Sequence, residues 1–270
     1  MNIAFWSASS GRGATSGNML AVSVMASLVY SVEGILLQFD YCSRSIDDVF
    51  SNRKNTNLLM EEYAYYNQKG IDTLLDRIQI RDIDINDINE NTVPVRNTLM
   101  KYIPASRRIK SGLNDREMIN STKMILKLLN QTGDVNFIDC INGEKTVSKA
   151  LLKSADVVVV NICQGMDIDR VIRDKELMKK AVFLVGRYDA KSNENLSVIR
   201  KKYGINRENI AVIPYNIGFH DAIQEGKVVP YITKYLSVKR NDDNFNFIND
   251  VFRATGMILR KAGYDEKSNV

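Results

Sequence analysis

The sequence is poor in the residues that build disulfide frameworks and metal centres. Its 270 residues include three cysteines, Cys42, Cys140 and Cys163, and a single histidine, His220. The cysteines form no Cys-x-x-Cys pair and flank apolar segments, so we expect reduced thiols in a cytoplasmic protein rather than a disulfide framework. One histidine without a neighbouring cysteine cluster argues against a zinc-type centre.

Long apolar runs are absent as well. No run reaches the roughly 20 residues that a membrane-spanning helix requires, and Met1 leads into a short apolar segment rather than a signal peptide. Residues 263–270, after the last expected helix, are polar and too few for a membrane-targeting tail. The composition, with 44% hydrophobic and 26% charged residues and a net charge of +5, indicates a soluble globular protein that permits an acidic partner without requiring one.

The first forty residues carry the pattern around which the chain is organised. Residues 2–7 form a short apolar segment, 18–30 follow a buried-helix pattern, and 35–40 form a second apolar segment that ends in an acid. Strand, glycine-containing turn, helix and strand in this order make a βαβ unit. The turn therefore precedes a helix N-terminus, where free backbone N–H groups and the helix dipole favour an anion.

This turn comes close to the phosphate-binding motif Gly-x-x-x-x-Gly-Lys-Ser/Thr. In that motif the lysine neutralises the β- and γ-phosphates, and the hydroxyl group binds Mg²⁺. The corresponding tripeptide here is Gly13-Ala14-Thr15, which keeps the glycine and the hydroxyl but lacks the lysine. A glycine-rich turn before a helix is often only a tight connection, so the turn by itself leaves both interpretations open.

The segment 7–40 resembles the deviant P-loop of MinD, ParA and their relatives, whose loop reads Lys-Gly-Gly-x-Gly-Lys-Thr-Thr and whose second strand ends Asp-x-Asp. On that alignment Ser9 and Ala14 replace the two lysines, and Gln38 replaces the first aspartate. Later segments resemble the family's Pro-Ala-Ser turn, its Walker B strand and switch II, its next strand and the two strands around its adenine pocket. In the family's order, these segments are 102–106, 137–143, 154–160, 186–189 and 212–215.

The resemblance implies an α/β fold, a three-layer sandwich in which helices flank a mostly parallel sheet, as in P-loop NTPases. It implies one such domain over 1–270, with 244–262 as a C-terminal helix that packs on the sheet. It further implies a site for ATP or ADP with Mg²⁺. The nucleotide-binding residues would be Ser10, Gly11, Arg12, Gly13, Ala14, Thr15, Ser16, Arg187, Asp189 and Pro214, and the metal would be held by Thr15, Asp40 and Asp139.

The replaced lysines and aspartate also bear on activity. Phosphoryl transfer depends on neutralising developing negative charge, and removing one such stabiliser commonly costs about 100- to 1000-fold in rate. The resemblance therefore implies a pseudo-ATPase with no catalytic residue assigned. Within the family the chain looks most like the TadZ type encoded with Flp (tight-adherence) pilus systems. That likeness implies a cytoplasmic, dimeric positioning or assembly factor with protein partners in such a system.

Two other functions stay open. A slow ATPase of the ParA type would act in DNA partition and would contact duplex DNA through basic residues. The candidates are Arg107, Arg108, Lys110, Lys201, Lys202, Lys239 and Arg240. Alternatively, a structural protein would leave the pocket empty, with Thr15 and Ser16 serving as helix caps.

The spacing of apolar residues predicts the remaining strands and helices. Apolar runs predict buried strands at 99–103, 135–140, 157–161, 181–188 and 209–213. Helices are predicted at 57–67, 71–80, 115–132, 146–153, 167–179, 193–203 and 244–262, and 220–226 resembles the family's helix before a Gly-x-Pro-like segment at 226–230. Residues 81–92 alternate Ile with Asp and Asn, which favours a polar connection or short helix over an edge strand.

Overall fold

An eight-stranded sheet runs through the protein, in the order β3-β4-β2-β5-β1-β6-β7-β8. The structure is a computed structural model that describes residues 1–9, 11–39, 45–50, 69–106, 115–132, 135–143 and 145–264. Within these ranges every neighbouring pair of strands is parallel except β3 with β4, so the prediction of a mostly parallel sheet is confirmed. The strands are β1 (Asn2–Trp6), β2 (Gly34–Gln38), β3 (Val93–Pro94), β4 (Met100–Tyr102), β5 (Val135–Asp139), β6 (Val157–Ile162), β7 (Ala181–Tyr188) and β8 (Ile210–Pro214).

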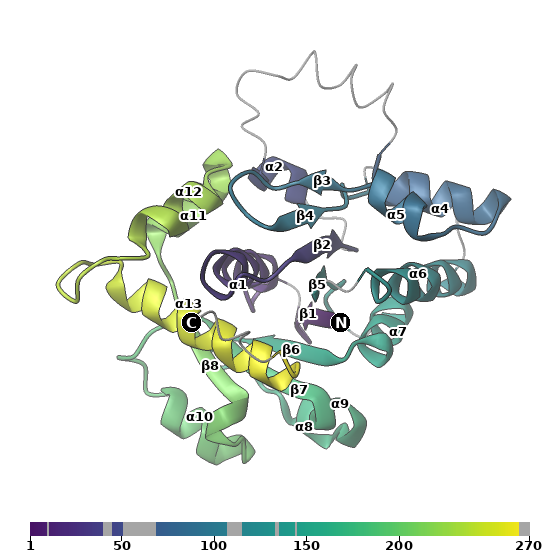
Figure 1. Ribbon diagram of the computed structural model, residues 1–270. Coiled ribbons are helices and arrows are strands. Elements are labelled where there is room, and N and C mark those ends of the chain that lie inside the picture. Colours follow the sequence, from purple (N-terminus) through teal and green to yellow (C-terminus); the bar gives the residue numbers. More distant parts are fainter. Residues whose placement is uncertain are drawn as a thin grey trace.

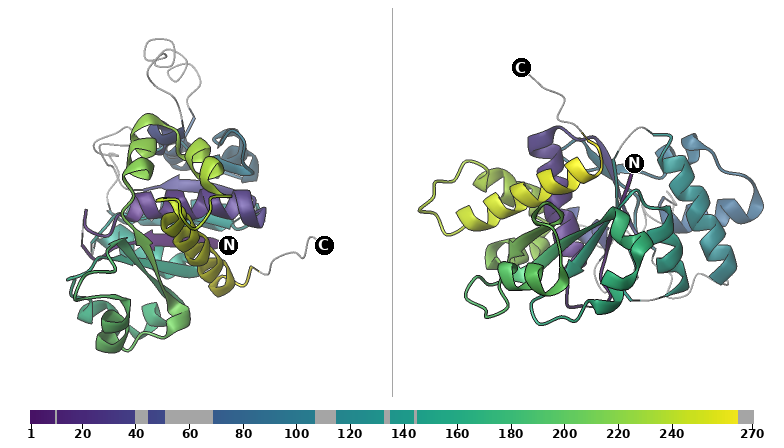
Figure 2. Two further views of the ribbon diagram at one scale, coloured as in Figure 1. Left: turned by 90° about the vertical axis from the view of Figure 1, so that its left-hand side faces the viewer. Right: turned by 90° about the horizontal axis from the view of Figure 1, so that it is seen from below.

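Helices cover both faces of the sheet and make up the outer layers seen in Figures 1 and 2. One face carries α1 (Thr15–Tyr30), α2 (Ile46–Phe50), α11 (Ile217–Glu225), α12 (Val228–Tyr235) and α13 (Phe245–Lys261). The other carries α4 (Ile71–Ile80), α5 (Ile85–Glu90), α6 (Asp115–Leu129), α7 (Thr146–Ser154), α8 (Asp169–Arg173), α9 (Lys175–Lys180) and α10 (Leu196–Tyr203). The predicted three-layer α/β sandwich is therefore confirmed.

The central strands send their side chains alternately into two cores. Ile3 and Phe5 of β1 belong to the core beneath α1, whereas Ala4 and Trp6 belong to the core on the opposite face. β6 alternates in the same way along 157–160. Because both faces are covered by helices, strands of this kind are apolar at nearly every position. This burial explains the continuous apolar runs in the sequence.

Helix α1 is buried on nearly every side. Residues 18–27 are all buried, and α1 packs against α13 as well as against the sheet. A Cβ at Gly256 of α13 would lie 2.7 Å from the Tyr30 hydroxyl oxygen, so a side chain there would displace that ring. The Tyr30 ring also stacks on Phe252, with ring centroids 5.5 Å apart. Helix α1 is therefore a rigid support for the loop that precedes it.

The structure departs from the single helix expected at 167–179, and it adds a helix at the Gly-x-Pro-like segment expected at 226–230. The first pattern forms two helices, because the Asp174 carboxylate accepts a hydrogen bond from the Leu177 N–H at 3.0 Å and starts α9. The second leads into α12, where Pro230 lies in the first turn and its missing N–H costs no hydrogen bond. The helix predicted at 57–67 lies outside the described residues.

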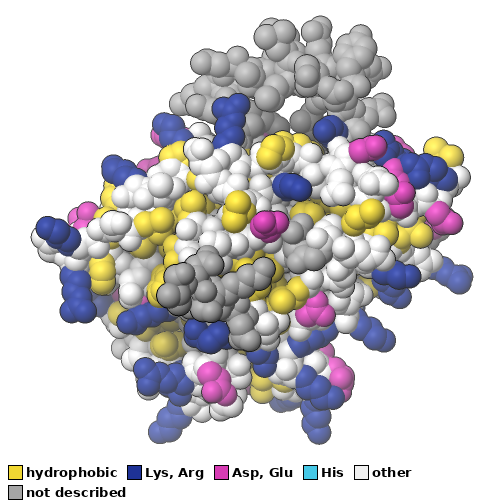
Figure 3. Space-filling model, viewed as in Figure 1, with side chains coloured by type: hydrophobic (Ala, Val, Ile, Leu, Met, Phe, Trp, Pro, Cys, Tyr) yellow, Lys and Arg dark blue, Asp and Glu magenta, His cyan; other side chains and the backbone are white. Residues whose placement is uncertain are grey.

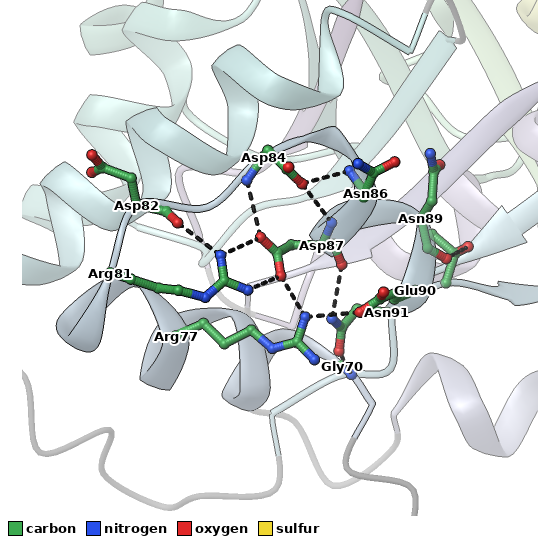
Figure 4. Close-up of polar contacts among 11 residues, drawn as sticks. Gly70, Arg77, Arg81, Asp82, Asp84, Asn86, Asp87, Asn89, Glu90 and Asn91 are labelled. Atoms are coloured by element: carbon green, nitrogen blue, oxygen red, sulfur yellow. Dashed lines mark hydrogen bonds and ion pairs between the residues drawn. The ribbon is translucent and has the colours of Figure 1, made fainter.

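The segment 81–92 contains the short helix α5, which a carboxylate network attaches to α4 (Figure 4). Asp84 caps α5, since its Oδ1 accepts hydrogen bonds from two first-turn N–H groups at 2.8 and 3.1 Å. Asp87 accepts hydrogen bonds from the guanidinium groups of Arg77 and Arg81. These bonds, chiefly that from Arg81, hold the pKa of Asp87 far below its ordinary value.

Basic side chains gather near the β7–β8 end of the sheet. Figure 3 shows dark blue Lys and Arg side chains along the lower rim of that view, over α8, α9 and α10. The last turn of α10 contains the basic run 200–202, and α9 ends with Lys179 and Lys180. Acidic residues are interleaved with them, as where Lys179 pairs with Glu176 at 2.7 Å. Across the described ranges, we find no helix with the length and apolarity of a membrane span.

Candidate nucleotide-binding site

The loop between β1 and α1 follows a central strand, where β1 separates β5 from β6 (Figure 1). Helix α1 begins at Thr15, and Ala14 before it is left-handed (φ 53°) and provides no side-chain cap. Gly11 is also left-handed (φ 75°). An L-residue in this conformation costs roughly 1–2 kcal/mol, so the surrounding structure must hold Ala14 in place. The uncapped N–H groups and the dipole of α1 favour an anion here.

Two buried asparagines hold the loop in this shape. The Asn18 amide donates hydrogen bonds to the Gly13 carbonyl oxygen at 3.0 Å and to Asn161 Oδ1 at 2.8 Å. Asn161 donates in turn to the carbonyl oxygens of Val159 at 3.1 Å and Trp6 at 3.4 Å. We call Asn18 and Asn161 the amide clamp. The amide clamp joins α1, β6 and the loop, and it gives the Gly13 carbonyl oxygen a hydrogen-bond donor within the protein.

Two glycines allow the neighbouring strands to approach the loop closely. A Cβ at Gly13 would lie 2.8 Å from the Asn161 carbonyl oxygen, and a Cβ at Gly186 of β7 would lie 2.6 Å from the Gly13 carbonyl oxygen. Backbone atoms cannot move aside at such distances, so both positions require glycine. The loop is therefore packed against the ends of β6 and β7.

Asp139, at the end of β5, contacts the first turn of α1 from the opposite flank. Its Oδ2 accepts hydrogen bonds from the Ser16 hydroxyl at 2.6 Å and from the Gln38 amide at 3.2 Å. Thr15 instead donates to Asn142 Oδ1 at 3.3 Å. The hydroxyl group that meets Asp139 thus belongs to Ser16 rather than to Thr15.

The segment after β5 is attached to the start of the loop. Asn142 Oδ1 accepts a hydrogen bond from the Ser7 N–H at 3.1 Å, and the Gly143 N–H donates to the Ser7 carbonyl oxygen at 2.9 Å. Trp6 Nε1 donates to the Gly143 carbonyl oxygen at 3.0 Å. These contacts place residues 142–143 beside the loop, so the motifs at 7–16 and 137–143 lie together in space.

The residues expected at the base pocket lie at the ends of β7 and β8. Arg187 is left-handed (φ 52°), and the register of β7 against β8 shifts between Gly186 and Tyr188. Pro214 pairs with Tyr188 across this bulge. Asp189 Oδ1 accepts a hydrogen bond at 2.9 Å from the N–H two residues further on, so this carboxylate shapes its own turn.

The predicted site residues that the structure describes fall into two groups. The phosphate-side group is one continuous loop with Asp139 beside it, and comprises Gly11, Arg12, Gly13, Ala14, Thr15 and Ser16. The base-side group is Arg187, Asp189 and Pro214. Ser10 and Asp40 lie outside the described residues, as do Arg107, Arg108 and Lys110. Sequence reasoning missed Asn18, Asn142 and Asn161, although an asparagine within an apolar helix or strand pattern is itself a signal.

The phosphate side offers oxygen donors suited to Mg²⁺. Among the described residues, no group of three or more His, Cys, Asp or Glu side chains is placed to hold a metal ion. A nucleotide-linked Mg²⁺ needs fewer protein ligands, because phosphates and waters supply the others. The Ser16 hydroxyl and the Asp139 carboxylate, 2.6 Å apart, provide hard oxygen atoms beside the loop. These residues fit an ion that binds together with a nucleotide.

No protein-family model and no curated protein sequence matches this chain. Solved structures, however, match it over almost its whole length. A ParA family ATPase from Chlorobium tepidum TLS superposes with a TM-score of 0.66 at 11% identity, covering 94% of this chain and 96% of the ATPase. The septum site-determining protein MinD of Pyrococcus horikoshii OT3, complexed with Mg-ADP, gives a TM-score of 0.67 at 13% identity over 100% and 99% of the two chains.

A plasmid partition protein of Borrelia burgdorferi B31 bound to AMPPNP gives a TM-score of 0.60 at 12% identity, covering 96% of this chain and 98% of the partition protein. At such low identity the likeness establishes the fold alone. The protein therefore has the α/β sandwich fold of the MinD and ParA P-loop ATPases, as the sequence motifs predict.

Proposed function

We propose that this protein binds ATP or ADP at the loop between β1 and α1 and acts as a positioning or assembly factor with little or no ATPase activity. The observation that carries the proposal is the uncapped start of α1, held in shape by the amide clamp. The fold adds support, because its solved relatives include proteins complexed with Mg-ADP and AMPPNP.

Main-chain N–H groups would supply most of the phosphate contacts. A hydrogen bond to a charged group contributes about 1.5–3 kcal/mol, so several N–H groups can hold a phosphate chain without a lysine. Mg²⁺, when bound, would neutralise part of the phosphate charge. The contacts favour Ser16 over Thr15 as the hydroxyl that holds it with Asp139, because Ser16 is the residue within hydrogen-bond distance of that carboxylate.

Fast hydrolysis is not expected, because the loop lacks the charges that stabilise phosphoryl transfer. Ser9 and Ala14 occupy the positions of the two lysines in the motif. Gln38, at the position of the lost aspartate, is engaged in structure: its amide donates to Asp139 at 3.2 Å and its Oε1 accepts from the Ile46 N–H at 3.0 Å. Such a residue attaches α2 to the sheet rather than activating a water molecule.

The cellular role is inferred from the solved relatives and from the sequence motifs. One solved structure is that of a septum site-determining protein and another is named as a plasmid partition protein, and both names describe positioning roles. We place this protein in the same general class, with a protein machine as its partner. The Flp pilus system is the specific machine that the motif pattern favours. A homodimer is the proposed assembly, by analogy with the family that the motifs resemble.

The decisive experiment is isothermal titration of the full chain with ATP and ADP, with and without Mg²⁺, alongside a phosphate-release assay. We expect saturable binding and phosphate release indistinguishable from the protein-free control. Thermal shift provides an independent check, since ligand at 100 times its Kd stabilises a protein by about 2.7 kcal/mol. If neither nucleotide binds at millimolar concentration, the proposal is wrong. Phosphate release at the rate of lysine-bearing relatives would contradict its pseudo-ATPase part.

A further inference from the structure

The proposed phosphate site has little positive charge of its own, and this inference rests on the function proposed above. From Ser7 to Asn18 the sequence contains one charged residue, Arg12, whose side chain is exposed. A triphosphate chain carries several negative charges, and one solvated cation and a helix dipole offset only part of them. The structure therefore raises the question of which other cation lies next to this loop.

Strand β7 lies against the end of the loop, although the two are far apart in the sequence. A Cβ at Gly186 would lie 2.6 Å from the Gly13 carbonyl oxygen and 3.4 Å from Ala14 Cβ. The β7 backbone thus touches the last two residues of the loop before α1 begins. The next residue along β7 is Arg187.

The backbone of Arg187 is held in an unfavourable conformation. It is left-handed (φ 52°) at the point where the register between β7 and β8 shifts. Glycine or asparagine takes this conformation at lower cost than arginine. Bulges next to functional sites re-aim a side chain, and strained residues concentrate at such sites. The bulge therefore presents a long cationic side chain where a smaller residue would fold more easily.

The neighbours of Arg187 have structural partners, whereas the Arg187 side chain has none among the described residues. The Tyr188 hydroxyl accepts a hydrogen bond from the Leu196 N–H at 3.1 Å. Asp189 exchanges backbone hydrogen bonds with the Gln164 side chain at 2.8 and 2.9 Å. The Arg187 side chain is exposed and makes no hydrogen bond or ion pair with any described residue. Its guanidinium is available to a ligand.

We propose that Arg187 supplies the positive charge missing from the loop and binds the phosphate chain of the nucleotide, not its base. Contact between Gly186 and the phosphate-side residues Gly13 and Ala14 puts Arg187 next to the phosphate end. A guanidinium donates two parallel hydrogen bonds to a phosphate and stays charged at all physiological pH values. Arg187 would then do in this protein what lysine does in the motif.

Titration of the wild type and of Arg187→Gly with ATP, ADP, AMP and adenosine tests this inference. We expect Arg187→Gly to bind ATP about 10- to 100-fold more weakly, to lose less affinity for AMP, and to bind adenosine unchanged. The Tm should stay the same or rise, because glycine relieves the left-handed backbone. Arg187→Lys should recover part of the ATP affinity, and Arg187→Asn provides a second uncharged variant that tolerates this backbone.

Ser31→Gly is the matched control. Ser31 is also left-handed (φ 52°) and exposed, but it follows the C-terminus of α1, away from the loop. It should raise the Tm without changing ATP affinity. If the wild type binds ATP and both uncharged Arg187 variants bind it equally well, the role of Arg187 is refuted while the proposed function stands. An equal loss for adenosine and ATP would also overturn it, because Arg187 would then contact the base. If the wild type binds no nucleotide, the proposed function fails first.

Discussion

Replacing Asn161 with alanine tests whether the amide clamp holds the loop between β1 and α1 in shape. The Asn161 side chain is fully buried. It contacts Asn18 in α1, after the loop, and Trp6 in β1, before the loop. The substitution removes the acceptor for Asn18 at 2.8 Å and the donor to the Val159 and Trp6 carbonyl oxygens. The Asn18 amide would keep one bond, to the Gly13 carbonyl oxygen, but would lose the partner that orients it.

The expected cost follows from these contacts. A net hydrogen bond contributes about 1 kcal/mol, and a buried polar group left without a partner costs about 1–3 kcal/mol. One good and two longer hydrogen bonds are lost, and a small cavity forms, so we expect Asn161→Ala to lower the free energy of unfolding by about 3 kcal/mol. The loop would then sample other conformations before binding, and nucleotide affinity should fall in proportion to the fraction of chains with the loop formed.

Two measurements on each variant separate these effects: urea denaturation gives stability, and titration with ATP gives affinity. Asn136→Ala is the matched control, because Asn136 is also fully buried and donates to Asn2 Oδ1 at 2.9 Å, but it lies near the start of β5. Both variants should lose stability, and only Asn161→Ala should lose affinity, by about tenfold or more. Equal ATP affinities for the two folded variants would show that the clamp does not shape the loop.

Three further outcomes are expected. Asp87→Asn should lower the free energy of unfolding by about 2 kcal/mol at pH 7. Because the pKa of Asp87 is lowered in the folded state, this difference in stability from the wild type should persist above the unfolded-state pKa of about 3.9 and shrink as the pH falls below that value. A difference in stability that grows as the pH falls would contradict the proposed network. Ser16→Ala should remove the Mg²⁺-dependent part of the ATP affinity, and Thr15→Val should keep it, in titrations with and without Mg²⁺. The reverse pattern would indicate that Thr15, not Ser16, binds the metal. Installing both lysines, Ser9→Lys with Ala14→Lys, should raise phosphate release above the wild type; no increase despite retained ATP binding would mean that the lost lysines are not what limits turnover.

The fold could be predicted from the sequence because its strongest signals are those of burial. A run such as 157–160 is apolar at every position only if both faces of its strand are covered, and this condition identifies a parallel sheet between helices. The loop at 8–16 was recognisable for a related reason, since glycine and small residues before a buried helix permit close backbone approach. These patterns depend on local composition, which a sequence displays directly.

The features that could not be predicted are contacts between side chains that lie far apart in the sequence. Gln38 reads as a lost acid in the sequence, yet it bridges Asp139 and the start of α2 in the structure. Asn18 and Asn161 are 143 positions apart, so neither predicts the other. For residues 81–92 the sequence predicted a polar connection or short helix, but the capping of that helix by Asp84 and the attachment of Asp87 to Arg77 and Arg81 required the three-dimensional fold.

The contacts around the loop explain how the proposed phosphate site would keep its shape without the two lysines of the family's motif. The loop conformation depends on the Asn18 and Asn161 amides and on the two close glycine contacts, all of which are internal to the protein. None of these contacts involves Ser9 or Ala14 side-chain charge, so replacing lysine at those positions leaves the loop's shape intact. Loss of charge should therefore reduce catalysis far more than binding, because catalysis requires interactions that strengthen in the transition state. A protein built in this way would keep a nucleotide as a bound ligand rather than consume it.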